Sequence, residues 1–236
     1  MGGAMNCVQP SNRRRASQRG ITLVELLVGM AVGLFIAATA TSLLVTHLRE
    51  SRSLVVEGRL MQDLRTAADI VTRDLRRAGH WGSAGAGVWS AGATGVATNP
   101  YTALSPDNVS TDTIVFRFSR DATENQQVDS NEQFGFRLRS GVIELQLGSG
   151  NWQALTDAGT LTVTRFSVEP DIAELSLADF CPTACAAGST TCPPRLQVRS
   201  LVVRIDGRAA TDSRVTRSVR SSVRLRNDVV LGACAS

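Results

Sequence analysis

The sequence predicts an α+β protein in which one long N-terminal helix, apolar in its first half, packs on an antiparallel β-sheet head. An uncharged apolar run extends from Leu26 to Thr46, and apolar residues then recur at helical spacing as far as Ala78. After about residue 112, short segments alternate apolar and polar residues between turn residues, as antiparallel strands do. The 236-residue length allows one or two small domains with a buried core.

The formal net charge of the chain is confined to its N-terminus. Residues 1–20 carry Arg13, Arg14, Arg15 and Arg19 and no acid, which accounts for the whole net charge of +4. Residues 21–236 are therefore formally neutral, and no basic field remains if the first 20 residues are removed. We expect no specific nucleic-acid partner on this ground.

The apolar run is long enough to cross a membrane. Its 21 residues from Leu26 to Thr46 would span about 31 Å as a helix, close to a bilayer core of about 30 Å. Three interpretations compete: a plain signal anchor, a secretory signal cleaved after Ala38-Thr39-Ala40, and a segment that later meets a partner's positive charge. Glu25 favours the third, because a carboxylate inside an apolar run costs about 2–3 kcal/mol at mid-bilayer and less near the interface.

A cut after Gly20 would give this carboxylate a physical role. The new ammonium at Ile21 would then precede an apolar helix, and Glu25 of one subunit could neutralise the terminal amine of its neighbour. The pair would also set the axial register, since a displaced subunit would bury an unpaired charge. The alternative is that Glu25 only extends its carboxylate to the membrane interface.

The segment Arg19-Gly20-Ile21-Thr22-Leu23-Val24-Glu25-Leu26 resembles the class III prepilin signal of type IV pilins and type II secretion pseudopilins. The resemblance implies cleavage by a prepilin peptidase between Gly20 and Ile21, N-methylation of Ile21, and a role for Glu25 in assembly. Ile21 departs from the usual phenylalanine. Ser42 stands where many major pilins have a helix-bending proline, which predicts a straighter helix.

The helix is predicted to run from residue 21 to about residue 78 and to become amphipathic in its second half. Its apolar face comprises Leu60, Leu64, Ala67, Ala68, Val71, Leu75 and Ala78. Gly79 is the expected C-cap. The stretch from Asp74 to Gly82, and more weakly Val219–Leu225, resembles PilW-type minor pilins; the alternative is an ordinary helix end with two exposed arginines. The expected domains are a leader at 1–20, a transmembrane and filament-core helix at 21–48, and a periplasmic head at 49–236.

The head is predicted to be one antiparallel sheet, with one face on the helix and one toward solvent, and the resemblance implies a pilin-like fold. Residues 82–111 are expected to form a long loop. The expected strands lie at 113–119, 134–138, 142–147, 152–155, 161–168, 196–205 and 215–225. Ser140-Gly141 predicts a tight hairpin between the second and third of these strands.

Cys181, Cys185, Cys192 and Cys234 form an even set in the last quarter of the chain, while Cys7 lies in the leader. We expect disulfides in an oxidising compartment, with all three pairings open. Zinc is disfavoured, because the spacing is wrong and no histidine is near.

Other polar residues form no expected site. His47 and His80 are too scattered for a catalytic or metal triad, and Asp107, Asp112, Asp171 and Glu174 are predicted to be solvated loop acids that are too sparse for calcium. We expect no catalytic residue, metal or cofactor.

These features and the resemblance together predict a minor type IV pilin that primes or caps pilus assembly, in adhesion, twitching motility or DNA uptake. Its expected partners are other minor and major pilins, the prepilin peptidase, the pilus assembly platform and, before assembly, the inner membrane. The head would face the periplasm and later lie in the extracellular pilus near its tip. Two alternatives remain: a minor pseudopilin of a type II secretion system, and a membrane-anchored adhesin or binding protein.

Overall fold

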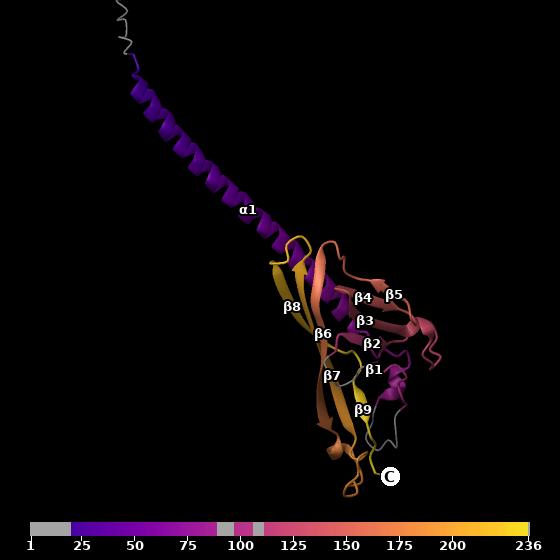
Figure 1. The fold of residues 1–236 in the computed structure, drawn as a ribbon. Helices are drawn as coiled ribbons and strands as arrows, with labels where there is room; N and C mark the ends of the chain where they lie inside the picture. The colour runs from indigo at the N-terminus through magenta and orange to yellow at the C-terminus, as the bar shows by residue number, and fades with distance from the viewer. Residues whose placement is uncertain (1–19, 89–96, 106–110, 236) are drawn as a thin grey trace, which may run out of the picture. The chain divides into compact units, whose positions relative to one another are not determined.

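Helix α1 and two antiparallel β-sheets make up the protein (Figure 1). The computed structural model describes residues 20–88, 97–105 and 111–235. The chain divides into two compact units, one ending at Ser51 and the other beginning at Arg52, and α1 (Leu23–Leu75) contributes to both. The predicted α+β class, with a long N-terminal apolar helix and antiparallel sheet, is confirmed.

The second half of α1 is amphipathic, as its sequence predicts. Six of the seven expected apolar positions are buried within α1, and the seventh, Ala78, is buried in the turns that follow. The regular helix ends at Leu75, three residues earlier than expected. The chain continues in turns to Gly79, whose φ of 75° lies in the left-handed region that glycine tolerates.

The first sheet is a five-stranded antiparallel meander in the order β1-β2-β3-β4-β5. Its strands are β1 (Leu104–Ser105), β2 (Thr113–Arg117), β3 (Gln133–Arg139), β4 (Val142–Leu147) and β5 (Trp152–Ala154). The predicted hairpin is present: Arg139 pairs with Val142, and the intervening Ser140 and Gly141 both have positive φ.

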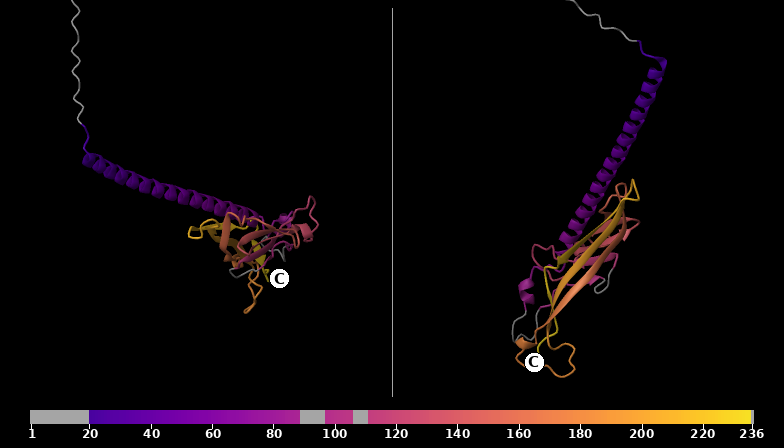
Figure 2. Two further views of the ribbon diagram at one scale, coloured as in Figure 1. Left: turned by 45° about the horizontal axis from the view of Figure 1, so that its top comes forward. Right: turned by 90° about the vertical axis from the view of Figure 1, so that its left-hand side faces the viewer.

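The remaining strands form a second sheet, so the prediction of a single sheet is wrong. This sheet contains β6 (Leu161–Ser176), β7 (Arg195–Ala209), β8 (Thr216–Arg224) and β9 (Val229–Leu231). β7 pairs with all three others, and the long orange and yellow strands lie side by side in Figure 1 and in the right-hand view of Figure 2. The alternation of side chains within a strand is the same in one sheet or two, which is why the division was not predicted.

Strand β6 is eight residues longer than expected and passes through Pro170. Among the described residues, β6 pairs along this stretch with β7 alone. The proline can therefore occupy an edge position without breaking a ladder on both sides. Asp171 and Glu174, which were expected in a loop, lie in this strand opposite Ser200 and Gln197.

The segment expected to be a long loop at 82–111 also contains regular structure. It includes the 3₁₀ helix η1 (Ala84–Gly87) and strand β1. Residues 89–96 and 106–110, and with them Asp107, lie outside the described residues. Two further short 3₁₀ helices are η2 (Ser130–Glu132) and η3 (Ala178–Phe180).

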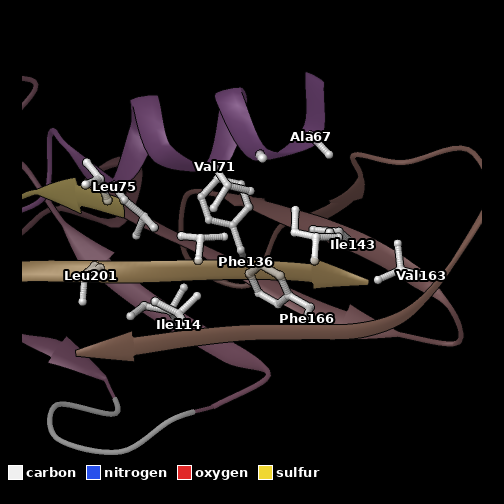
Figure 3. Close-up of a cluster of buried hydrophobic side chains, with 14 of the residues drawn as sticks. Ala67, Val71, Leu75, Ile114, Phe136, Ile143, Val163, Phe166 and Leu201 are labelled. Carbon is white, nitrogen blue, oxygen red and sulfur yellow. The ribbon is translucent and has the colours of Figure 1, made fainter. Parts of the chain in front are cut away.

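The core of the head forms where α1 meets both sheets (Figure 3). Figure 3 shows Val71 of α1, Phe136 of β3 and Phe166 of β6 directed into one apolar cluster. Helix and sheet approach closely at Gly207 of β7, where a Cβ atom would lie 3.1 Å from Leu64 Cδ2 and 2.6 Å from Leu161 Cδ1. A side chain at residue 207 would therefore have to displace the side chains of Leu64 and Leu161.

Two glycine-to-alanine changes test this packing, because they should have different effects on the free energy of unfolding. Gly207→Ala should lower the free energy of unfolding by about 1–3 kcal/mol, because it overpacks a filled core. Gly58→Ala, at an exposed helical position with no atom near the added Cβ, should leave it unchanged or raise it by up to about 1 kcal/mol. Guanidinium denaturation of the full chain in detergent measures both. Equal effects of the two changes would contradict the packing described.

Candidate functional site

Helix α1 begins directly after the bond that the sequence predicts to be cleaved. Gly20, Ile21 and Thr22 are exposed and precede the helix. Thr22 caps it: the Glu25 N–H donates to Thr22 Oγ1 at 3.3 Å, and the Leu26 N–H donates to the Thr22 carbonyl at 3.1 Å. The Gly20–Ile21 bond therefore lies in non-helical, accessible chain, where a peptidase can reach it.

Glu25 is exposed in the first turn of α1. A carboxylate there interacts favourably with the helix dipole, and Thr22-x-x-Glu25 has the sequence of a capping box. The structure shows the Thr22 half of such a box, and the dipole interaction is a local effect of Glu25 that sequence reasoning had not weighed. Over the part of the chain that the structure describes, no cation forms an ion pair with its carboxylate.

A row of small residues continues along α1 from Glu25. Gly29, Gly33 and Ala37 follow it at spacings of four, so they lie on the same helix face. Ile21, Glu25 and Gly29 also line a shallow surface hollow together with Leu26 and Met30. Small residues at this spacing let apolar helices approach closely. Sequence reasoning missed this row, although the Gly29-x3-Gly33 spacing was visible.

The apolar part of α1 is suited to an apolar environment that excludes water. The helix is long and apolar enough to span a membrane, and its apolar window has no buried residue within the chain. Thr39, Thr41 and Thr46 direct their hydroxyls to the helix backbone, donating to the carbonyls of Ile36, Ala37 and Ser42 at 2.9, 2.7 and 3.1 Å. These hydroxyls therefore need no water as a partner.

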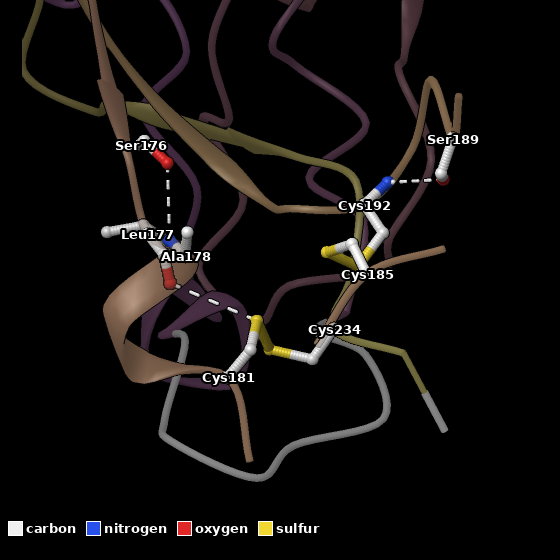
Figure 4. Close-up of a disulfide and its surroundings, with 8 residues drawn as sticks. All are labelled: Ser176, Leu177, Ala178, Cys181, Cys185, Ser189, Cys192 and Cys234. Carbon is white, nitrogen blue, oxygen red and sulfur yellow. Dashed lines mark hydrogen bonds between the residues drawn. A yellow bond between two sulfur atoms is a disulfide. The ribbon is translucent and has the colours of Figure 1, made fainter. Parts of the chain in front are cut away.

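The four C-terminal cysteines form two disulfides at one end of the second sheet (Figure 4). Cys181 bonds to Cys234 and Cys185 bonds to Cys192, with Cα–Cα distances of 5.3 and 5.5 Å. The first joins the segment after β9 to the loop between β6 and β7, and the second closes a short ring inside that loop. The sequence had left this pairing open.

The described residues offer no metal centre. No group of three or more histidine, cysteine, aspartate or glutamate side chains within them could hold an ion. His47 Nδ1 lies 3.8 Å from Glu50 Oε2 on an exposed helix surface, and His80 is exposed in a turn. Cys7 and the leader arginines lie outside the described residues.

The Asp74–Gly82 stretch joins the helix end to the head. The Gly79 N–H donates to the Arg117 carbonyl at 2.8 Å, and the Gly79 carbonyl accepts hydrogen bonds from the side-chain amides of Asn99 and Asn227. The Arg77 guanidinium stacks 4.1 Å from the centroid of the Phe118 ring. The stretch therefore connects the helix end to the first sheet and to the C-terminal segment, while Arg76 and Arg77 are exposed.

A buried polar cluster also contacts the Asp74–Gly82 stretch, through the hydrogen bond from the Gly82 N–H to Glu124. The Tyr101 hydroxyl lies 2.8 Å from the Gln127 carbonyl oxygen and 3.1 Å from Glu124 Oε1, and burial raises the pKa of this phenol. Burial also disfavours the Glu124 carboxylate, but hydrogen bonds from the N–H groups of Gly82 and Gln126 outweigh it and lower the Glu124 pKa. A neutral donor thus faces a charged acceptor, which suits a structural bond rather than proton transfer.

Two family models match the chain. Residues 53–225 match the model described as prepilin peptidase-dependent protein B, and residues 15–41 match the prokaryotic N-terminal methylation motif. The first covers about three quarters of the chain, and the second includes Gly20, Ile21 and Glu25. No curated protein and no solved structure matches the chain.

The two disulfides should contribute unequally to stability, because they close loops of different length. Cys181–Cys234 spans 53 residues and Cys185–Cys192 spans 7. The chain-entropy relation then assigns about 4 kcal/mol to the first and about 2 kcal/mol to the second. Replacing Cys181 and Cys234 by serine should therefore lower the denaturation midpoint further than replacing Cys185 and Cys192.

Thiol labelling provides the matching chemical test. In the denatured, unreduced chain, Cys7 of the unprocessed precursor should be the only cysteine that reacts. Four further reactive thiols, or zinc bound in stoichiometric amount, would contradict the pairing.

Proposed function

The chain belongs to the prepilin peptidase-dependent protein B family and is a type IV pilin-like protein, and we propose that it is a minor pilin that primes or caps pilus assembly. The observation that carries the proposal is the sequence of features at the start of α1. An accessible Gly20–Ile21 bond is followed by Glu25 and then by an uncharged, uncovered apolar helix. In this role the chain is a structural subunit and not an enzyme.

The proposed mechanism proceeds from membrane to filament. The chain inserts through residues 21–48 with its head in the periplasm, and the prepilin peptidase cleaves after Gly20. Ile21 then carries the new terminal amine, which is N-methylated. As apolar helices bundle on the assembly platform, Glu25 pairs with the amine of a neighbouring pilin. The row of Gly29, Gly33 and Ala37 would let that neighbour approach closely.

The minor-pilin role and the position near the pilus tip rest on the PilW-type resemblance. Its strongest stretch, Asp74–Gly82, connects the helix end to both the first sheet and the C-terminal segment. The disulfides suit an oxidising compartment such as the periplasm. A pseudopilin of type II secretion would share these features, so a test must observe the pilus itself.

We predict that the mature chain begins at Ile21 with a methylated amine. Mass spectrometry of the N-terminal peptide from membranes containing the peptidase measures this directly. A chain that starts at Thr41 would identify an ordinary secretory signal and would exclude the filament role.

Glu25→Ala and Glu25→Gln should both leave membrane insertion and cleavage intact but prevent incorporation into pili. Deleting one partner of a buried ion pair costs about 3–5 kcal/mol, which corresponds to roughly a hundred-fold or greater loss of incorporation. Incorporation is measured from the tagged subunit in sheared pili, with membrane levels for normalisation.

The two substitutions separate charge from helix capping. Glutamine can replace glutamate in a capping box but carries no charge, so normal assembly of Glu25→Gln alone would identify capping as the role of Glu25. The matched control is Glu50→Ala, which removes an exposed glutamate from the same helix beyond the apolar run and should assemble normally. If both Glu25 variants assembled normally, the subunit would dock through its head and helix face alone, as a subunit at the very tip could.

A further inference from the structure

The neutral mature chain has strongly segregated charges. Residues 195–226, which contain β7 and β8, include nine arginines and two aspartates, a formal charge of +7. Residues 111–179 include eleven acids and five arginines, a formal charge of −6. Overall neutrality therefore conceals a basic hairpin in the second sheet.

Strand alternation places several of these arginines on the face that points away from α1. Leu201, Val203 and Ile205 of β7 are buried, and Gly207 faces Leu64 of α1. Arg204 and Arg208 alternate with them and are exposed on the opposite face.

Strands β6, β7 and β8 lie side by side (Figure 1), and their register extends this group across all three. Arg220 of β8 lies directly opposite Arg204, and Arg165 of β6 lies opposite Asp206. Arg165, Arg204, Arg208 and Arg220 are called the arginine face below.

The arginine face carries more positive charge than its surroundings neutralise. The Arg204 Nε lies 3.2 Å from Asp206 Oδ1. Glu169 of β6, opposite Val202, lies on the same face two residues along the strand from the partner of Arg204. Within residues 20–88, 97–105 and 111–235, no carboxylate forms an ion pair with Arg165, Arg208 or Arg220. Four other arginines of the hairpin do have acidic partners: Arg195, Arg214, Arg217 and Arg224. The direct opposition of Arg204 and Arg220 is unfavourable unless an anion lies between them.

The side chains around these arginines are hydrogen-bond donors. The exposed positions along β8 are Thr216, Ser218, Arg220, Ser222 and Arg224. Arginine forks and serine or threonine hydroxyls are the side chains that contact phosphate oxygens in nucleic-acid complexes. No aromatic residue alternates with them to stack on bases, so such contacts would be independent of sequence.

We propose that the arginine face binds the phosphodiester backbone of DNA without sequence preference. A membrane surface fits less well, because no exposed apolar side chain lies among the four arginines to enter the lipid. A second copy of the chain also fits less well, because many of its acids already have partners. Glu124, Glu132, Glu144 and Glu174 all accept hydrogen bonds within the chain. The inference concerns the head alone and holds whether or not the proposed filament role is correct.

The size of the arginine face sets the expected strength of binding. Arg204 and Arg208 are four residues apart on one strand, roughly 13 Å, and adjacent strands are about 4.8 Å apart. Such a patch can neutralise about three phosphates. The affinity should then be in the range of non-specific binding and fall on the order of 40-fold between 50 and 200 mM salt.

Fluorescence anisotropy of a labelled 20-base-pair duplex with the full chain in neutral detergent tests the proposal. Arg208→Gln with Arg220→Gln should weaken binding roughly 100-fold at 50 mM salt and reduce the salt slope by about two. The matched control is Arg195→Gln with Arg214→Gln, which removes two paired arginines outside the arginine face and should change the affinity far less. The leader arginines are the same in all variants, so the comparison isolates the sheet. Equal loss in both double variants, or none in either, would overturn the proposal.

Asp206→Asn provides a second test, in which DNA binding should become stronger and not weaker. It removes the carboxylate that pairs with Arg204 and should strengthen DNA binding several-fold, whereas a purely structural role of this surface predicts no gain. Thermal unfolding of each variant, followed by circular dichroism, verifies that the head remains folded. Polyglutamate and vesicles containing phosphatidylglycerol serve as competing anions. Tighter binding to polyglutamate would identify an acidic protein partner, tighter binding to vesicles would identify a membrane, and either would overturn the assignment to DNA.

Discussion

Helix α1 is one continuous helix whose two halves require different environments, the first an apolar one and the second the core of the head. From Leu26 to Thr46 it carries no charge and none of its side chains is buried within the chain, so its apolar surface must be covered by lipid or by other helices. From Leu60 onward, one face supplies part of the head core while charged residues occupy the other. Neither half can be exchanged for the other, because a head-type pattern would bring charge into the membrane.

The end of α1 determines how the head is held together. The Gly79 carbonyl accepts hydrogen bonds from Asn99 and Asn227, which are far apart in the sequence. Arg199 of β7 donates to the Thr102 carbonyl at 2.7 Å and so links the same loop to the second sheet. The C-terminal segment that contains Asn227 is in turn covalently joined to the β6–β7 loop through Cys234. Helix end, loop and C-terminus thus form one connected junction.

The sequence predicted local features of the fold well and their arrangement less well. Helical spacing identified every buried apolar position of α1 from Leu60 to Leu75, and Ser140-Gly141 identified the hairpin. The division into two sheets was missed, because side-chain alternation does not specify which strands pair. The disulfide pairing was open for the same reason: it depends on β9 adding to β7 beside the β6–β7 loop, a contact between distant segments. Glu25 stands out in the sequence because a carboxylate beside an apolar run is unusual, and its role in assembly stays a prediction.

The arginine face was missed because net charge averages over positions that the fold separates. Only the register, which places Arg220 opposite Arg204, reveals that the positive residues gather on one surface. Glu25 and the arginine face share one property: over the described part of the chain, neither has enough opposite charge to neutralise it. Their surroundings make the consequences different. Water can solvate exposed arginines at little cost, so a partner there is optional, weakly held and sensitive to salt. An apolar bundle excludes water, so a carboxylate in it needs a cation from another chain. In the proposed filament we therefore expect docking through Glu25 to be obligatory and selective for register.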